Sequence, residues 1–151
     1  PTEFATLWSS YLMQGRQLID KLGDIICPLF YLKQRMHGLN ADKFNKLRNI
    51  VKNEGRRRTD LYPLKVLLDK FEQPIGLFIG LRDQEKINKN TIKEFPKIMP
   101  DGHPVGGIVR LKAKDVEFDL PTYLQDSYNC IIAFTKEIIG NAEWGSVHGR
   151  F

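Results

Sequence analysis

The sequence predicts a mainly α-helical protein, a bundle of about four main helices with a short β-hairpin inserted before the last helix. The chain has 151 residues, of which 42% are hydrophobic and 27% charged, and this suits one compact domain with its own core. Apolar residues recur with the helical period in four segments, whereas residues 108–120 alternate as a strand does. We expect residues 1–140 to form a single helical domain and residues 141–151 to form a C-terminal tail.

The first predicted helix follows Thr2, which can cap it, and continues for about seven turns. Gly15 lies on its apolar side, where the lack of a side chain would let another helix approach closely. Pro28 has no N–H group and should kink or restart the helix. The apolar stripe of this helix consists of Phe4, Leu7/Trp8, Tyr11/Leu12, Leu18/Ile19, Leu22, Ile25/Ile26 and Leu29.

The second and third helical regions follow Asn40 and Pro63. Asn40 can cap the helix ADKFNKLRNIVKN, and Pro63 is tolerated near the start of a helix. Pro74 should interrupt the third region. Its last part, from Ile75 to about Lys86, is apolar nearly all round, so we expect it to be central in the bundle.

The last third of the sequence contains a loop, a hairpin and a helix. Residues 88–107 are rich in proline and glycine and are typical of a loop. Residues 108–120 alternate and predict a short β-hairpin with its turn near Ala113 and Lys114. The last helix opens at Pro121 and should end at Gly140, a natural C-cap.

Positive charge is concentrated in the second helix and the loop after it. Residues 33–70 contain eleven Lys or Arg and four Asp or Glu, although the net charge of the whole chain is only +5. A basic stripe of this kind is what contact with a phosphate backbone requires, and a solvated helix face has the same composition. The RNA-binding residues that this pattern suggests are Lys43, Lys46, Lys52, Arg56, Arg57 and Arg58.

Several other classes of protein are not indicated. No apolar run approaches the roughly 20 residues that span a membrane, and the stretch PTEFATLWSS lacks the pattern of a secretory signal. Cys27 and Cys130 lie among apolar residues without CxxC spacing, so we expect buried thiols in a cytoplasmic protein. No metal site and no cofactor are predicted, because there is no phosphate-binding glycine loop and no metal-ligand motif.

Two charged pairs interrupt the apolar pattern. Arg16 and Asp20 lie four residues apart at the edge of the first stripe, in GRQLID, a spacing that also allows an ion pair within the helix. Arg82 and Asp83 end an apolar run, in LRDQEKIN. With the loop, hairpin and last amphipathic helix that follow, these stretches resemble the HEPN superfamily (higher eukaryote and prokaryote nucleotide-binding), particularly its uncharacterised prokaryotic members. The resemblance covers about residues 4–139.

The resemblance implies a chemistry for Arg82 and Asp83. Many HEPN proteins are metal-independent ribonucleases of toxin–antitoxin, phage-exclusion and CRISPR systems, and two copies often meet in a dimer. Their Arg would hold the scissile phosphate, and a His four to six intervening positions later would move protons. Arg82 and Asp83 match the Arg and the polar position after it, but those later positions hold Ile87, Asn88 and Lys89. His103, on the loop after Arg82, is the best candidate to replace the missing His.

A structural role for the same residues is the favoured alternative. Arg82 would pair with Asp20, and Asp83 with Arg16, tying the two helices together. The function we expect is a HEPN-like domain, possible as a homodimer, that binds RNA, a nucleotide or a protein such as a cognate antitoxin in a bacterial or phage defence or toxin–antitoxin setting, without standard nuclease activity. The alternatives are an atypical metal-independent ribonuclease that uses Arg82, and a purely structural protein-interaction domain.

Overall fold

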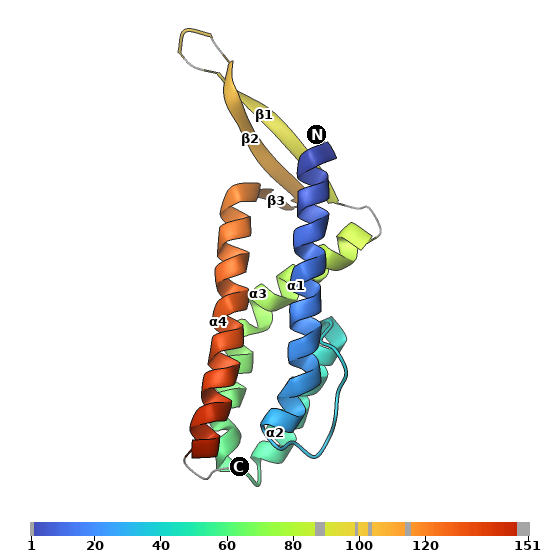
Figure 1. The fold of residues 1–151 in the computed structure, drawn as a ribbon, viewed down its shortest axis with the longest axis vertical. Coiled ribbons are helices and arrows are strands. Elements are labelled where there is room, and N and C mark those ends of the chain that lie inside the picture. Colours follow the sequence, from blue (N-terminus) through green and yellow to red (C-terminus); the bar gives the residue numbers. More distant parts are fainter. Residues whose placement is uncertain (1, 87–89, 99, 103, 114–115, 148–151) are drawn as a thin grey trace.

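The structure, a computed structural model, describes residues 2–86, 90–98, 100–102, 104–113 and 116–147. It is mainly α-helical, as the sequence predicts, and its long helices lie along the longest axis of the molecule (Figure 1). The helices are α1 (Thr2–Leu29), α2 (Ala41–Gly55), the 3-10 helix η1 (Thr59–Leu61), α3 (Tyr62–Lys86) and α4 (Leu120–Val147). The strands are β1 (Asn90–Ile98), β2 (Pro104–Ala113) and β3 (Val116–Asp119).

The predicted apolar stripe of α1 faces the core, where one member of each adjacent pair is buried. Trp8, Leu12, Ile19 and Ile26 are buried, whereas Leu7 is exposed. This is the expected result when a helix of 3.6 residues per turn packs one face against its neighbours. The buried residues of α2, α3 and α4 complete the same core, so the four helices form one unit.

The predicted close approach at Gly15 is confirmed. The ring of Phe78 from α3 lies directly over Gly15, and a Cβ added there would lie 2.9 Å from Phe78 Cε1 and closer still to Cζ. The absence of a side chain on α1 therefore lets the middle of α3 pack against it. The spatial relation on which the Arg82 hypothesis depends, α3 beside α1, is present in the structure.

The chain returns along α1 before it enters α2, as Figure 1 shows for residues 30–40. Carboxylates of α1 hold this segment: Asp24 Oδ1 accepts the N–H of Gly38 at 2.6 Å, and Asp20 Oδ1 accepts that of Leu39 at 3.2 Å. The predicted cap is also confirmed, because Asn40 Oδ1 accepts the N–H of Lys43 at 2.8 Å. This bond satisfies one of the N–H groups that a helix start leaves without a partner.

The two prolines inside helices act differently from the prediction. Helix α1 ends at Leu29, one residue after Pro28, and the chain turns away through Tyr31, which has a φ of 52°. No helix restarts there. Helix α3 continues through Pro74 to Lys86, so the predicted interruption is wrong. In Figure 1, α3 runs beside α4 in its first half and then crosses behind α1.

The prediction of a lone short β-hairpin before the last helix is wrong, although β2 and β3 pair antiparallel within residues 108–120, from Arg110 with Asp119 to Ala113 with Val116. Residues 90–119 instead contain a three-stranded antiparallel sheet of order β1-β2-β3, and it lies at one end of the helical body (Figure 1). Strand β1 and the start of β2, residues 104–107, fall in the segment that was predicted as a loop. Pro96 supplied the loop signal, but β1 is an edge strand with a register shift between Pro96 and Ile98, and edge strands and bulges are where a sheet tolerates proline.

Helix α4 is longer than predicted. It passes through Gly140, which is exposed, and reaches Val147. Ala142, beyond the predicted C-cap, is buried in the core, and this packing outweighs the tendency of glycine to end a helix. The predicted tail over residues 141–151 is therefore helical as far as Val147, and residues 148–151 lie outside the described part of the chain.

Candidate functional site

A basic hollow lies where α2 ends and α3 begins. Its volume is about 520 Å³, and its lining combines apolar residues with four cationic side chains. We use the name "basic hollow" for this site, whose lining includes Val51, Leu61, Tyr62 and the cations Lys52, Arg56, Arg58 and Lys65. Val51 and Leu61 are buried, whereas the side chain of Tyr62 is largely open to solvent, with 66% of the residue exposed.

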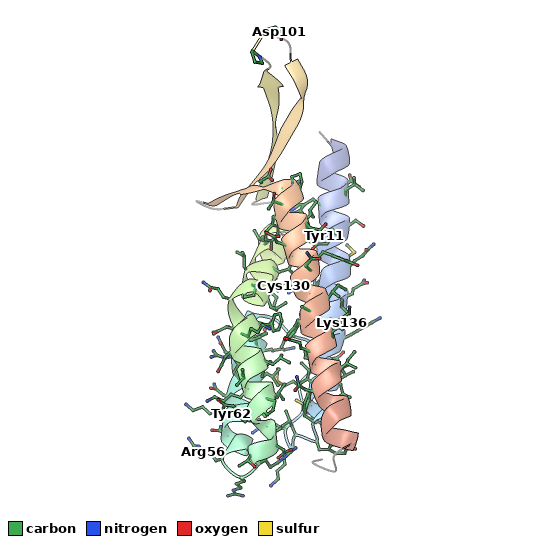
Figure 2. All side chains as sticks on the ribbon, turned by 90° about the vertical axis from the view of Figure 1, so that its left-hand side faces the viewer. Tyr11, Arg56, Tyr62, Asp101, Cys130 and Lys136 are labelled. Atoms are coloured by element: carbon green, nitrogen blue, oxygen red, sulfur yellow. The ribbon has the colours of Figure 1, made fainter. Side chains whose placement is uncertain are left out.

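Helical spacing brings these residues together. Lys52 and Arg56 lie four residues apart at the end of α2, and Tyr62 and Lys65 lie three apart in the first turn of α3. Residues at these spacings share a helix face. In Figure 2 the labelled side chains of Arg56 and Tyr62 lie at the end of the molecule opposite to Asp101. The two faces therefore meet across the short connection of Arg57 to Leu61.

Arg58 differs from the other cations, because its guanidinium is already bound. Nη1 donates to the carbonyl oxygens of Phe30 and Tyr31, each at 3.0 Å, and Nη2 donates to Asp60 Oδ2 at 2.7 Å. A guanidinium with several fixed partners acts as a brace. Arg58 therefore fixes the wall of the basic hollow against the end of α1 and contributes its charge from a set position.

The six cations proposed from the sequence do not share one face. Lys43 Nζ donates to the carbonyl of His37, and Lys46 is exposed outside the lining of the basic hollow. Lys43 and Lys52 lie nine residues apart, about 180° around α2. Arg57 is exposed next to the hollow but does not line it. The structure brings together Lys52, Arg56 and Arg58 of the predicted set.

Sequence reasoning missed Tyr62 and Lys65 as site residues. Tyr62 falls outside the apolar stripe of the third helix, which consists of Leu64, Leu67, Leu68 and Phe71. An outward aromatic residue three positions before a lysine, just after a run of arginines, is the signal that could have identified them. The signal can be interpreted only when it is known that α2 and α3 meet at this end, and helical periodicity alone does not show that.

The Arg82 network lies elsewhere, between α1 and α3. Arg82 is 9% exposed, and its Nε and Nη2 donate to Asp83 Oδ1 at 3.2 and 3.0 Å. Its Nη1 lies 4.0 Å from Asp20 Oδ1, the oxygen that also accepts the N–H of Leu39. The predicted contact between Arg82 and Asp20 is present. Arg16 pairs with Asp20 at 3.5 Å in place of the expected Arg16–Asp83 pair.

The surroundings of Arg82 argue against a catalytic role in which its guanidinium holds a phosphate. Two carboxylates already surround the guanidinium, and Nη1 is buried with no hydrogen bond to any described residue. An arginine that holds a phosphate must present free donors to it. His103 and residues 87–89 lie outside the described part of the chain, so the approach of His103 to Arg82 stays a prediction.

A group of aromatic and hydroxyl side chains joins α1 to α4. The hydroxyl groups of Tyr11 and Ser127 lie 2.5 Å apart, and Trp8 packs edge-on against Tyr123 with 6.0 Å between ring centroids. Burial raises the pKa of Tyr123 well above its ordinary value and also raises the pKa of Tyr11 and of the Cys130 thiol. These shifts favour the neutral forms, so the group stabilises the core and supplies no activated nucleophile.

Metal-binding and membrane-spanning features were also sought in the described residues. In that part of the chain no three His, Cys, Asp or Glu side chains gather closely enough to hold a metal ion. None of the helices described there combines the length and hydropathy needed to cross a bilayer. Cys27 and Cys130 are free thiols; Cys27 is buried as the sequence predicts, whereas Cys130 is only half-buried.

No protein-family model, no curated protein and no solved structure matches the chain. The resemblance to the HEPN superfamily therefore stays a prediction from the layout and the two short stretches around Asp20 and Arg82.

Proposed function

We propose that this protein binds single-stranded RNA through the basic hollow. The observation that supports the proposal is a hollow of about 520 Å³ that places Lys52, Arg56 and Lys65 around an exposed tyrosine ring. The expected HEPN-like character of the chain agrees with a nucleic-acid ligand. The proposal concerns binding, and the setting implied by the resemblance is a defence or toxin–antitoxin system.

The two kinds of side chain in the basic hollow suit the two parts of a nucleotide. Lysine and arginine neutralise phosphates and release condensed counterions, which supplies most of the affinity for nucleic acid. An aromatic face stacks on an unpaired base and contributes about 1–3 kcal/mol per base. Bases are accessible for stacking in single strands, whereas a double helix hides their faces. A single strand is therefore the form of RNA that uses both Tyr62 and the cations.

Cleavage is not part of the proposal. Arg82 is bound by Asp83 and lies near Asp20, and its low exposure leaves little room for a phosphate. The basic hollow has no histidine among its described lining residues, so it offers no general base with a pKa near neutrality. Both observations favour a binding role over a ribonuclease role.

Fluorescence anisotropy with a labelled oligouridylate of about 20 nucleotides at low salt tests the proposal. We expect Lys52→Ala/Arg56→Ala to weaken binding at least tenfold. The slope of log affinity against log salt should fall by about 1.4, because each phosphate contact with a single strand contributes about 0.7. Arg58→Ala is unsuitable, since it would also release the carbonyls of Phe30 and Tyr31.

The matched control removes two cations from another part of the surface. Lys21 and Lys136 are exposed on α1 and α4, and Figure 2 places Lys136 away from Arg56. Lys21→Ala/Lys136→Ala changes the net charge equally and should retain the affinity within about twofold. Equal losses in both double variants would show non-specific attraction and would overturn the assignment of the basic hollow.

A further inference from the structure

Two further hollows, formed by described residues, adjoin the basic hollow along the seam between α2 and α3. A second, of about 330 Å³, shares Lys52 and Lys65 with it, and a third, of about 590 Å³, shares Asn45 and Asp69 with the second. Hollows that share lining residues adjoin each other. The seam therefore offers a run of connected concave surface that begins at Tyr62 and continues along both helices.

Charge changes sign along this run. The described lining of the basic hollow contains four cations and no acidic residue, whereas the charged residues that line the third hollow are Asp69, Glu72 and Lys70. The cations near that far end are already occupied. Arg48 lies between Asp69 and Glu72 at 2.8 Å from each, and Lys70 Nζ lies 3.0 Å from Glu137 Oε1 on α4. Two carboxylates therefore share the single guanidinium of Arg48, and the far end keeps a net negative charge, whereas Lys52, Arg56 and Lys65 make the Tyr62 end positive.

A phosphate chain that passed along the whole seam would meet carboxylates at the far end. Like charges brought together at an interface cost free energy and select against such a ligand. A ligand with its negative charge gathered at one end avoids this repulsion. A terminal phosphate monoester has that character, because it carries nearly two negative charges near neutral pH while an internal phosphodiester carries one.

We propose that the basic hollow holds the terminal phosphate monoester of a nucleotide chain, with the adjoining base stacked on Tyr62. This inference rests on the proposed RNA binding and names the part of the RNA that is bound. Lys52, Arg56 and Lys65 surround the phosphate, and Arg58 contributes charge from its braced position. Asn45 and Asn49 line the second hollow, where their amide groups can form hydrogen bonds with the next nucleotide of the chain. A free mononucleotide presents the same phosphate chemistry.

Competition against the labelled oligouridylate tests the inference. Three unlabelled ten-nucleotide oligouridylates are compared, one with a 5′-phosphate, one with a 3′-phosphate and one with neither, and uridine 5′-monophosphate forms a fourth arm. We expect at least one phosphorylated oligonucleotide to compete about tenfold better than the unphosphorylated one, because the extra charge lies among several cations. In Lys52→Ala/Arg56→Ala this preference should disappear, and Lys21→Ala/Lys136→Ala should retain it.

The outcomes separate the two proposals. Equal competition by all three oligonucleotides, together with weaker binding in Lys52→Ala/Arg56→Ala, would overturn the terminal-phosphate inference and leave RNA binding at the basic hollow intact. No binding of any probe would overturn both. Competition by uridine 5′-monophosphate as strong as that of the phosphorylated oligonucleotide would support the phosphate site and identify a free nucleotide as its ligand. Tyr62→Leu should weaken each phosphorylated probe severalfold if the ring stacks on a base.

Discussion

The residues around Arg82 form an asymmetric charge cluster. The side chain of Arg82 is 10% exposed, whereas those of Asp20 and Asp83 are 36% and 55% exposed. Water can solvate either carboxylate if the arginine is removed. It cannot solvate the guanidinium equally well if the carboxylates lose their charge. The stability of the fold should therefore depend more on the two acids than on the arginine itself.

Neutralising the acids tests this asymmetry. Asp20→Asn/Asp83→Asn keeps the size of both side chains and leaves a buried cation without counter-charge, so we expect a loss of about 1–3 kcal/mol. Arg82→Leu should cost less than about 1 kcal/mol. Urea unfolding of the two variants gives both values, with Asp126→Asn on the exposed face of α4 as a charge control. A greater loss in Arg82→Leu than in the double variant would contradict the structural role.

The sequence predicted part of this cluster. The pairing of Arg82 with Asp20 followed from two helices whose apolar faces must pack, with charged groups at the edge of each stripe. The partner predicted for Asp83 was wrong. Asp83 pairs with the adjacent Arg82, and Arg16 pairs with Asp20 on its own helix. Such choices depend on side-chain rotamers, and the spacing of residues along a helix does not determine them.

At the scale of the element, two helix glycines differ in what surrounds them. Gly15 lies under the ring of Phe78, which is buried in the core and cannot move away freely. Gly140 lies inside α4 with nothing within 4 Å of an added Cβ. Glycine lowers the stability of a helix wherever its small size is not needed. Only the first glycine is needed for packing.

Alanine substitutions should therefore have opposite effects at the two sites. Gly15→Ala forces α1 and α3 apart and should lower the free energy of unfolding by about 1–3 kcal/mol. Gly140→Ala should raise it by about 0.5–1 kcal/mol through helix propensity alone. Thermal or urea unfolding measures both changes. Stabilisation by Gly15→Ala would mean that α3 does not pack on α1 as described.

Elements with a strong helical period were predictable, whereas the sheet was predictable only where β2 pairs with β3. The helices follow from apolar stripes, and α2 also from its Asn40 cap. Strand β1 contains Pro96 and pairs with a stretch that includes Gly106 and Gly107, so its composition is that of a loop. Pairing with β2 overrides that local preference, because residues far apart in sequence supply the hydrogen bonds. The position of the basic hollow was missed for the same reason, since it forms only where α2 and α3 meet.

At the scale of the whole molecule, burial of phenol and thiol groups predicts sensitivity to alkaline pH. Burial raises the pKa of Tyr123 above its ordinary 10.0, and it raises the pKa of Cys27 and Cys130 above 9.0. Above these ordinary values the unfolded chain loses protons that the folded chain keeps. The unfolded state then binds fewer protons, so the free energy of unfolding falls as pH rises.

We expect stability to be insensitive to these groups below about pH 9 and to decline from there upward. Tyr123→Phe removes one of the contributing hydroxyl groups, so its decline above pH 10 should be shallower than that of the unsubstituted protein. Urea unfolding at a series of pH values between 7 and 11 provides the comparison. Parallel declines in the two proteins would show that Tyr123 does not contribute.

The brace formed by Arg58 has a consequence for recognition. It joins the wall of the basic hollow to the carbonyls of Phe30 and Tyr31, just after the end of α1, so that wall is ordered before any ligand arrives. A preorganised surface loses little conformational entropy on association, and more of the contact energy remains as affinity. A ligand that binds this ordered wall would in turn stabilise the folded form of the α1 terminus, because it binds the folded state only. The end of the first helix thus becomes a reporter of occupancy, although it is connected to the ligand only through Arg58.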